Sequence, residues 1–176
     1  MVILDAQMSN TNKNQFTHLK IHTQYSICEG AVKIIDLKNF CKKNKIHAIG
    51  LSDTKNLCGA LEFAENISKV GTQPIIGSQI NFKFKDQIGI LTIIANNFEG
   101  YKSIIGLSSK SYLENKTTDE PHCLFQELLN IKSGTTVLSG SFGGLIGNLF
   151  VKNLLTEIDE VLKLIKDIFK DKFYLE

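Results

Sequence analysis

Short apolar runs alternate with amphipathic helical patterns along this 176-residue chain, and the alternation limits the folds that it can adopt. Runs with the length and composition of strands cover residues 17–22, 48–51, 73–84, 88–95, 135–139 and 173–175. Helical spacing occupies the sequence between them, at about 32–44, 57–71, 98–113, 124–130 and 158–169. Strands that alternate with helices favour an α/β fold built on a mainly parallel sheet.

The helical patterns predict which side chains face the core. Apolar residues recur at helical spacing in three groups: Ile34, Leu37 and Cys41; Leu57, Ala60, Leu61, Ala64 and Ile67; and Ile158, Val161, Leu162, Ile165 and Phe169. In segment 98–113 we expect Tyr101, Ile104, Ile105 and Ser108 to point inward. The polar stretch 114–122 contains a proline and predicts an exposed loop.

Residues 16–30, FTHLKIHTQYSICEG, contain the most distinctive polar side chains of the chain. Strand-like alternation puts His18, Lys20 and His22 on one face, and the turn that follows brings Glu29 near the same strand end. Imidazoles beside a carboxylate are groups that bind divalent metals. An ordinary strand with its polar face toward solvent explains the same residues, and the residues alone favour that interpretation.

The charge balance argues against nucleic-acid binding by overall electrostatics. The 20 basic and 18 acidic side chains give a net charge of +2, so contact with DNA requires a local patch. The cysteines Cys28, Cys41, Cys58 and Cys123 lack zinc-ribbon spacing, and we expect them to be small buried side chains in a reducing compartment. No signal-peptide pattern or membrane-length apolar run occurs, which predicts a cytoplasmic protein without membrane contact.

Several strings in this sequence resemble motifs of the polymerase and histidinol phosphatase (PHP) domain family. They are the stretch 16–30, LSDTKNLCG at 51–59, PIIGSQINF at 74–82, LTIIANNFEGYKSIIGLSSKSY at 91–112, VLSG at 137–140 and FYLE at 173–176. Several of them resemble the branch of the family that begins the alpha subunit of bacterial replicative DNA polymerase III. The resemblance covers residues 16–176 and leaves 1–15 as a polar leader. It implies a PHP-type (β/α)7 barrel that is incomplete at its C-terminal side in this chain.

Active members of the family hold a cluster of metal ions at the barrel mouth, where the ions activate a water and brace a phosphate. The resemblance carries their ligand positions onto this chain as His18, Lys20, Glu29, Thr54, Gln79, a position near Gly89, and Ser141. His22 and Asp53 are polar neighbours of that set. Since most of these positions lack a metal-binding side chain, the resemblance implies a degenerate site without a bound metal.

Lys20 is the most damaging of these replacements. Its ammonium places a fixed positive charge where cations would sit, and it offers no lone pair. Thr54 and Gln79 provide only neutral oxygens, so the remaining donors fall short of the three protein ligands of a catalytic zinc site. We expect Lys20 to pair with Glu29 in place of an ion. The glycine-rich string 139–144 lacks the spacing and lysine of a P-loop and is better interpreted as a tight turn.

The resemblance implies a scaffold within a DNA-directed DNA polymerase, with no catalytic residue and no cofactor in this segment, and with Mg²⁺ used by the parent polymerase. The implied partners are the proofreading exonuclease subunit, other replicase subunits, and DNA through the parent polymerase. One alternative is a metal-dependent 3′–5′ exonuclease or phosphoesterase, as in relatives with intact ligands. Another is an α/β domain unrelated to replication. The ligand positions disfavour the first alternative, and the number of matching strings disfavours the second.

Overall fold

The computed structural model describes residues 16–116, 118–131 and 133–176, so the leader 1–15 lies outside the described residues. The helices are α1 (Ile34–Asn44), α2 (Ala60–Ser68), α3 (Phe98–Leu113), α4 (Phe125–Leu129), α5 (Leu145–Val151), α6 (Leu155–Phe169) and the 3-10 helix η1 (Lys170–Lys172). The strands are β1 (Ala48–Thr54), β2 (Gln73–Phe84), β3 (Gln87–Ala95), β4 (Cys123–Leu124), β5 (Thr135–Leu138) and β6 (Phe173–Tyr174). Within the described segments, no helix is long and apolar enough to cross a membrane.

One mixed sheet organises the fold, in the order β1-β2-β3-β5-β6, with β4 also paired to β2. β3 runs antiparallel to both β2 and β5, whereas the other pairs are parallel. The mixed α/β structure is confirmed, and the sheet is mainly parallel as expected, since of the described strands β3 alone runs against the direction of the others. Only Lys85 and Asp86 separate the paired residues Phe84 and Gln87. Such a short connection forces a hairpin, because a parallel crossover needs about a dozen residues or more.

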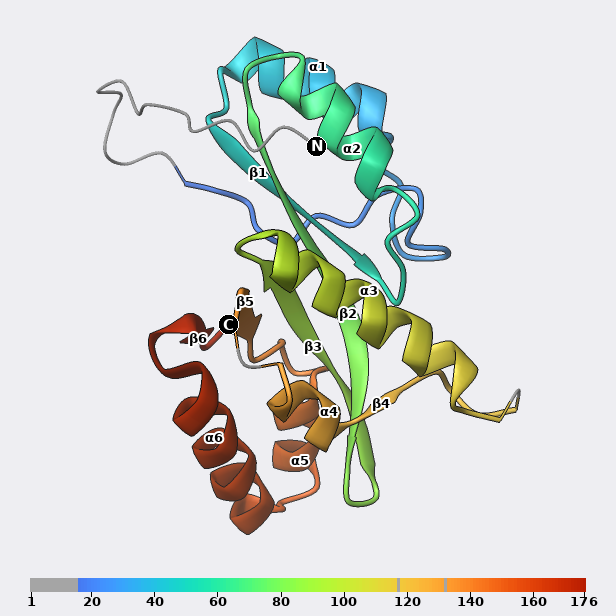
Figure 1. The fold of residues 1–176 in the computed structure, drawn as a ribbon, viewed down its shortest axis with the longest axis vertical. Helices are drawn as coiled ribbons and strands as arrows, with labels where there is room; N and C mark the ends of the chain where they lie inside the picture. Colours follow the sequence, from blue (N-terminus) through green and yellow to red (C-terminus); the bar gives the residue numbers. More distant parts are fainter. Residues whose placement is uncertain (1–15, 117, 132) are drawn as a thin grey trace.

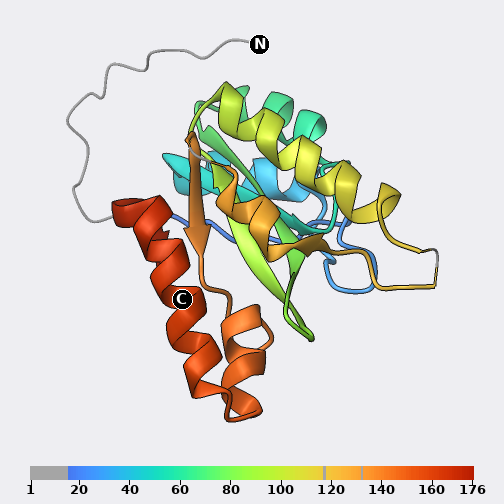
Figure 2. The same ribbon diagram turned by 60° about the horizontal axis from the view of Figure 1, so that its bottom comes forward.

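The β2–β3 hairpin runs between two groups of helices (Figure 1). At one end α1 and α2 pack over β1, around a core that includes Ile34, Phe63 and Ile67. At the other end α5 and α6 lie side by side (Figure 2). A second core, which includes Phe82 and Leu91, joins the hairpin to α3, α4, α5 and α6. The sheet is not closed, since its order runs from β1 to β6 without a pairing between these two strands in the described residues.

The predicted strand at 17–22 forms a single isolated bridge, which joins Ile21 to Leu51 of β1. The Gly50 N–H donates to the His18 carbonyl at 2.6 Å, and the Ile21 N–H donates to the Gly50 carbonyl at 3.3 Å. In a regular parallel ladder, the residue that accepts from the Gly50 N–H and the residue that donates to the Gly50 carbonyl are two positions apart. Here they are His18 and Ile21, three positions apart, so the segment contains one extra residue between them. The extra residue reverses the alternation of side chains between the two faces. The expectation that His18 and His22 share one face is therefore wrong, and His18 is exposed while His22 is half-buried.

Two helix faces differ from the predicted ones. In α2, Leu61 is 72% exposed, and Phe63 is fully buried in its place. In α3, Ile105 is exposed and Leu107 is buried. The aromatic ring of Phe63 removes more apolar surface from water than the side chain of Leu61, which favours the face of α2 that turns Phe63 inward together with Ala60 and Ile67.

The cysteines divide into two buried and two exposed residues. Cys41 and Cys123 are buried as expected, but Cys28 and Cys58 are exposed, so the prediction is wrong for this pair. Burial raises the pKa of the Cys123 thiol to about 12. Its Sγ also donates a hydrogen bond to the Leu107 carbonyl at 3.2 Å. The two buried thiols therefore behave as small core side chains.

Candidate functional site

Four polar side chains meet where β1 ends beside β2 and the turn at 25–30. Thr54, the last residue of β1, pairs in register with Gln79 of β2. The Thr54 Oγ1 lies 2.5 Å from Glu29 Oε2, 3.2 Å from His22 Nδ1 and 3.5 Å from Gln79 Oε1. We call His22, Glu29, Thr54 and Gln79 the His22 cluster.

The hydrogen bonds around His22 indicate which ring nitrogen carries the proton. The short distance from Thr54 to Glu29 is that of a hydroxyl donating to a carboxylate. The Ser26 hydroxyl donates to Asp53 Oδ1 at 2.7 Å. His22 Nδ1 lies 3.4 Å from Ser26 Oγ and 3.2 Å from Thr54 Oγ1. Because both hydroxyl protons are directed at carboxylates, a ring that carries its proton on Nδ1 satisfies these contacts, which leaves Nε2 as an acceptor.

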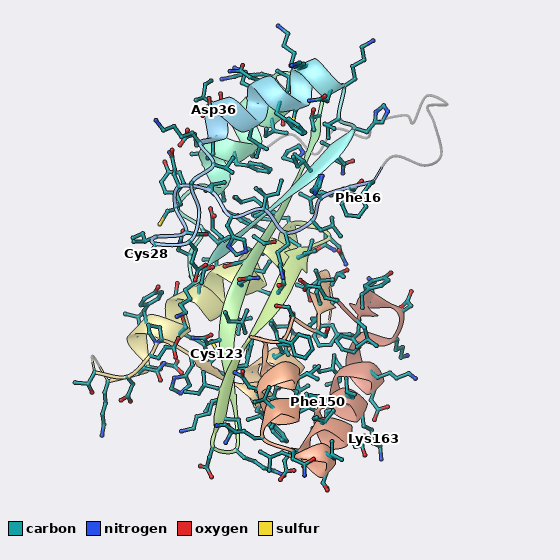
Figure 3. The ribbon with its side chains drawn as sticks, turned by 180° about the vertical axis from the view of Figure 1, so that it is seen from behind. Phe16, Cys28, Asp36, Cys123, Phe150 and Lys163 are labelled. Atoms are coloured by element: carbon teal, nitrogen blue, oxygen red, sulfur yellow. The ribbon has the colours of Figure 1, made fainter. Side chains whose placement is uncertain are left out.

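Asp53 lies beneath the cluster and is 1% exposed. Its carboxylate accepts from the Thr23 N–H at 2.6 Å, from the Thr23 hydroxyl at 2.7 Å and from the Ser26 hydroxyl. Three donors compensate for the loss of water around a buried anion. Asp53 therefore holds the segment that supplies His22 against the end of β1. Figure 3 shows this segment crossing the sheet between the labelled residues Phe16 and Cys28.

Lys20 forms its ion pair with Glu176, so the expected pair with Glu29 is wrong. Both side chains of the observed pair are 26% exposed. The Glu176 N–H also donates to Ser139 Oγ at 2.9 Å, which fixes the residue beside the end of β5. Glu29 is instead engaged by the Thr54 hydroxyl, as described above. The Lys20–Glu176 pair joins the segment along the outer edge of β1 to the opposite edge of the sheet, at β6.

A family model of the PHP domain matches residues 18–176 of the chain. The chain belongs to the PHP domain family. DNA polymerase III subunit alpha of Haemophilus influenzae is 33% identical over 168 residues, which are 94% of this PHP chain and 14% of that protein. The same subunit of Borreliella burgdorferi is 33% identical over 175 residues, covering 93% of this chain and 15% of that protein. The PHP chain thus spans a small part of the length of the curated relatives that it matches.

Two solved structures share the PHP fold of this chain. A protein from Bifidobacterium adolescentis described as a metal-dependent phosphoesterase has a TM-score of 0.50 and 10% identity, covering 86% of this chain and 83% of that one. An amidohydrolase from Chromobacterium violaceum has a TM-score of 0.53 and 7% identity, covering 82% and 74%. At such low identities these structures support the fold alone.

The structure brings together three of the ligand positions that the PHP family implies. Glu29, Thr54 and Gln79 all lie in the His22 cluster. The fourth member, His22, was expected only as a polar neighbour. Strand alternation placed it on the face of His18, and the extra residue in that segment leaves His22 in contact with Thr54.

The other positions of this PHP domain lie outside the cluster. His18 is exposed and stacks edge-on against Phe16 with ring centroids 4.8 Å apart. Gly89 packs against α5, since a Cβ built on it would lie 2.4 Å from the Leu145 Cα. Gly89 also does not lie opposite Gln79, because the β3 residue that pairs with Gln79 is Thr92. Ser141 is exposed after β5.

A second polar group lies next to the cluster and was not anticipated from the sequence. Glu120 Oε1 accepts from Lys55 Nζ at 2.7 Å and from the buried Asn81 Nδ2 at 2.9 Å. The hydrogen bond from Lys55 is the largest cause of the lowered pKa of Glu120. Through Lys55 and Asn81, Glu120 lies beside the edge of β2 that pairs with both β1 and β4. The polar composition of 114–122 predicted a loop but carried no signal that the loop folds back onto the sheet.

The donors present do not fit a PHP metal cluster. In the described part of the chain, no group of three or more histidine, cysteine, aspartate or glutamate side chains is placed to hold a metal ion. His22 and Glu29 offer an imidazole and a carboxylate, and Thr54 and Gln79 add neutral oxygens. Two conventional donors are fewer than the three of a catalytic zinc site.

Proposed function

We propose that this PHP domain is part of the alpha subunit of a bacterial replicative DNA polymerase III and acts there as a scaffold and docking domain. The single observation that carries the proposal is 31–34% identity to such subunits over 92–96% of the chain. Polymerisation, its Mg²⁺ and the DNA substrate belong to other parts of the parent polymerase. The domain works in the cytoplasm, where it docks the proofreading exonuclease subunit and other replicase subunits.

The His22 cluster supports a degenerate metal site. We propose that the two histidine positions that open the family's motif correspond to Lys20 and His22 in this chain. This alignment lies two residues later than the one that the sequence alone suggested. His22 contacts Thr54, which occupies another ligand position. In either register Lys20 replaces a histidine, and its ammonium opposes the binding of cations. The remaining donors therefore maintain local structure in place of binding an ion.

We place the open sheet in a (β/α)7 barrel that the parent polymerase completes. The Lys20–Glu176 pair supports this placement, because it brings the two outer edges of the sheet to within the length of two side chains. A curved sheet whose edges approach one another needs few further strands to close. Closure also covers exposed strand edges, which otherwise invite pairing with other chains.

Elemental analysis of the chain purified without chelator tests the degenerate site. We expect no stoichiometric zinc, manganese or iron, because the cluster offers too few ligands. The expectation also holds for a Lys20→His variant, since Thr54 and Gln79 remain unable to replace the missing donors. Two or more tightly held ions per chain would overturn this part of the proposal.

Activity assays test the scaffold role. We expect no cluster-dependent turnover of primed DNA, single-stranded DNA or a generic phosphate ester, each with added manganese. The decisive variant is His22→Ala with Glu29→Gln, and His47→Ala serves as a control because His47 is exposed and lies outside the cluster. Co-elution with a purified proofreading exonuclease subunit on size exclusion tests the docking role, and separate elution of the two proteins would contradict it.

One observation favours a second candidate, a metal-dependent phosphoesterase or exonuclease. The Nδ1 atom of His22 lies 3.7 Å from the Glu29 carboxylate, so an imidazole and an acid are adjacent at an accessible site. Turnover that His22→Ala abolishes and His47→Ala preserves would favour this candidate over the scaffold.

A further inference from the structure

Positive charge is concentrated on α1 and the residues that flank it. The 13 residues from 33 to 45 contain five lysines and a single acid, Asp36, which gives a net charge of +4. The rest of the chain has 15 basic and 17 acidic side chains and is net negative. We call the five residues the α1 lysine surface: Lys33, Lys38, Lys42, Lys43 and Lys45.

These lysines form no ion pair with a carboxylate of the described residues. The ion pairs between described side chains use lysines elsewhere in the fold: Lys20, Lys55, Lys85, Lys102 and Lys110. Four members of the α1 lysine surface are exposed, and Lys38 is half-buried. A set of unpaired like charges on one helix creates a local positive potential that attracts an anionic partner.

The stability of α1 accounts for only part of this charge. Lys42 and Lys43 lie in the last turn, where cations complement the helix dipole. Lys33 is the N-cap, without a side-chain capping bond, where a cation opposes the dipole. Lys45 takes the left-handed conformation with φ 50, which glycine or asparagine adopts at lower cost. Lysine thus occupies two positions that other residues would stabilise better.

We propose that the α1 lysine surface binds the phosphate backbone of double-stranded DNA. The lysines lie along a helix of about 17 Å, and duplex DNA carries one negative charge per about 1.7 Å of its axis. α1 stands at one end of the molecule (Figure 1), so a duplex can approach it without meeting α5 or α6. Uniform phosphate charge suits lysine point charges distributed along one helix and its two caps, whereas an acidic protein would need carboxylates matched to their positions. The inference goes beyond the proposed function, in which DNA contacts only other parts of the polymerase.

Fluorescence anisotropy with a labelled duplex tests the proposal across a series of salt concentrations. If four lysines each contact one phosphate, the slope of log K against log salt is about −3.6. Affinity then falls about 150-fold between 50 and 200 mM salt. The variant Lys42→Gln with Lys45→Gln removes two contacts, so we expect its slope to be about −1.8 and its binding at low salt to be at least about tenfold weaker.

The matched control is Lys163→Gln with Lys166→Gln on α6. Both residues are exposed, Lys166 is in the last turn of its helix as Lys42 is, and the charge change is identical. Figure 3 shows Lys163 at the end of the molecule opposite Asp36 of α1. We expect this control to keep the wild-type slope, and circular dichroism of both variants tests that they fold.

Three outcomes would overturn the proposal. They are the absence of duplex binding by the wild-type chain at low salt, equal effects of the α1 and α6 variants, and polyglutamate that competes better than DNA at equal charge. The last outcome would identify an acidic protein as the partner. The metal and turnover measurements do not depend on any of these results, so the proposed function stands or falls separately.

Discussion

The Lys20 ammonium binds the carboxylate of Glu176 across 156 residues of sequence. Lys20 lies in the segment beside β1, and Glu176 follows β6, so the pair connects the first and last parts of the sheet order. The contact joins the two outer edges of an otherwise open sheet.

Replacement of Lys20 by methionine is expected to destabilise the chain by about 0.5–1.5 kcal/mol. Both partners are 26% exposed, which reduces the effect below that of a fully buried pair. Urea unfolding measures the change. The loss should be smaller in a Glu176→Gln background and unchanged in a Glu29→Gln background. Coupling to Glu29 in place of Glu176 would contradict the observed pairing.

Replacement of Asp53 by asparagine is expected to cost about 2–4 kcal/mol. The amide group would face donors from Thr23 and Ser26 that now bind a buried carboxylate. Asp36→Asn is the control, because Asp36 is exposed on α1 and should cost less than about 1 kcal/mol. Equal midpoints of urea unfolding for the two variants would refute the structural role of Asp53.

Two glycines of α3 should respond to alanine in opposite directions. A Cβ at Gly100 would lie 1.7 Å from the Gly134 carbonyl oxygen, so the helix must move away from its support. We expect a loss of about 1–3 kcal/mol. A Cβ added at Gly106 would meet no heavy atom within 4 Å, and alanine should stabilise the exposed helix by up to about 1 kcal/mol. Thermal unfolding of the two variants should therefore shift to lower and higher temperature, respectively.

The cysteines should react in two classes. Iodoacetamide is expected to modify the exposed Cys28 and Cys58 in the native chain, and the buried Cys41 and Cys123 only after unfolding. Mass spectrometry of the modified protein counts the labels. Rapid native modification of all four thiols would contradict their burial.

Burial of Cys123 also predicts a dependence of stability on pH. The folded thiol has a pKa of about 12, whereas its ordinary value is 9.0. The unfolded chain therefore loses this proton first, and the free energy of unfolding falls as pH rises from about 9 toward 12. A Cys123→Val variant should show a weaker decline in urea unfolding over that range. An unchanged decline would assign it to other groups.

Periodicity alone predicted β2, α3 and most other elements, since each extends over enough residues to repeat its pattern. β4 has two residues and α5 has seven, which is too short for a clear period. The direction of β3 was available from the two-residue connection at Lys85–Asp86, but its almost wholly apolar run resembled a strand of a parallel sheet.

The candidate site was predicted less completely than the fold. Glu29, Thr54 and Gln79 meet as the resemblance implied, because Glu29 lies in a turn, Thr54 ends β1, and Gln79 lies beside Thr54 in β2. The extra residue near His18 and the pairing of Lys20 with Glu176 depend on how distant segments settle against one another. No local pattern encodes either feature.

The antiparallel placement of β3 has a consequence for synthesis of the chain. β2 and β3 are joined by two residues, so the hairpin can form within about 1–10 μs of their release. The other edge of β3 pairs with β5, which begins at Thr135. A ribosome adding about 5–20 residues per second needs about 2–8 s to make the residues between them. During that interval the edge of an almost wholly apolar strand is open to other chains, so the rate of translation through 96–134 sets the time in which nascent chains can aggregate.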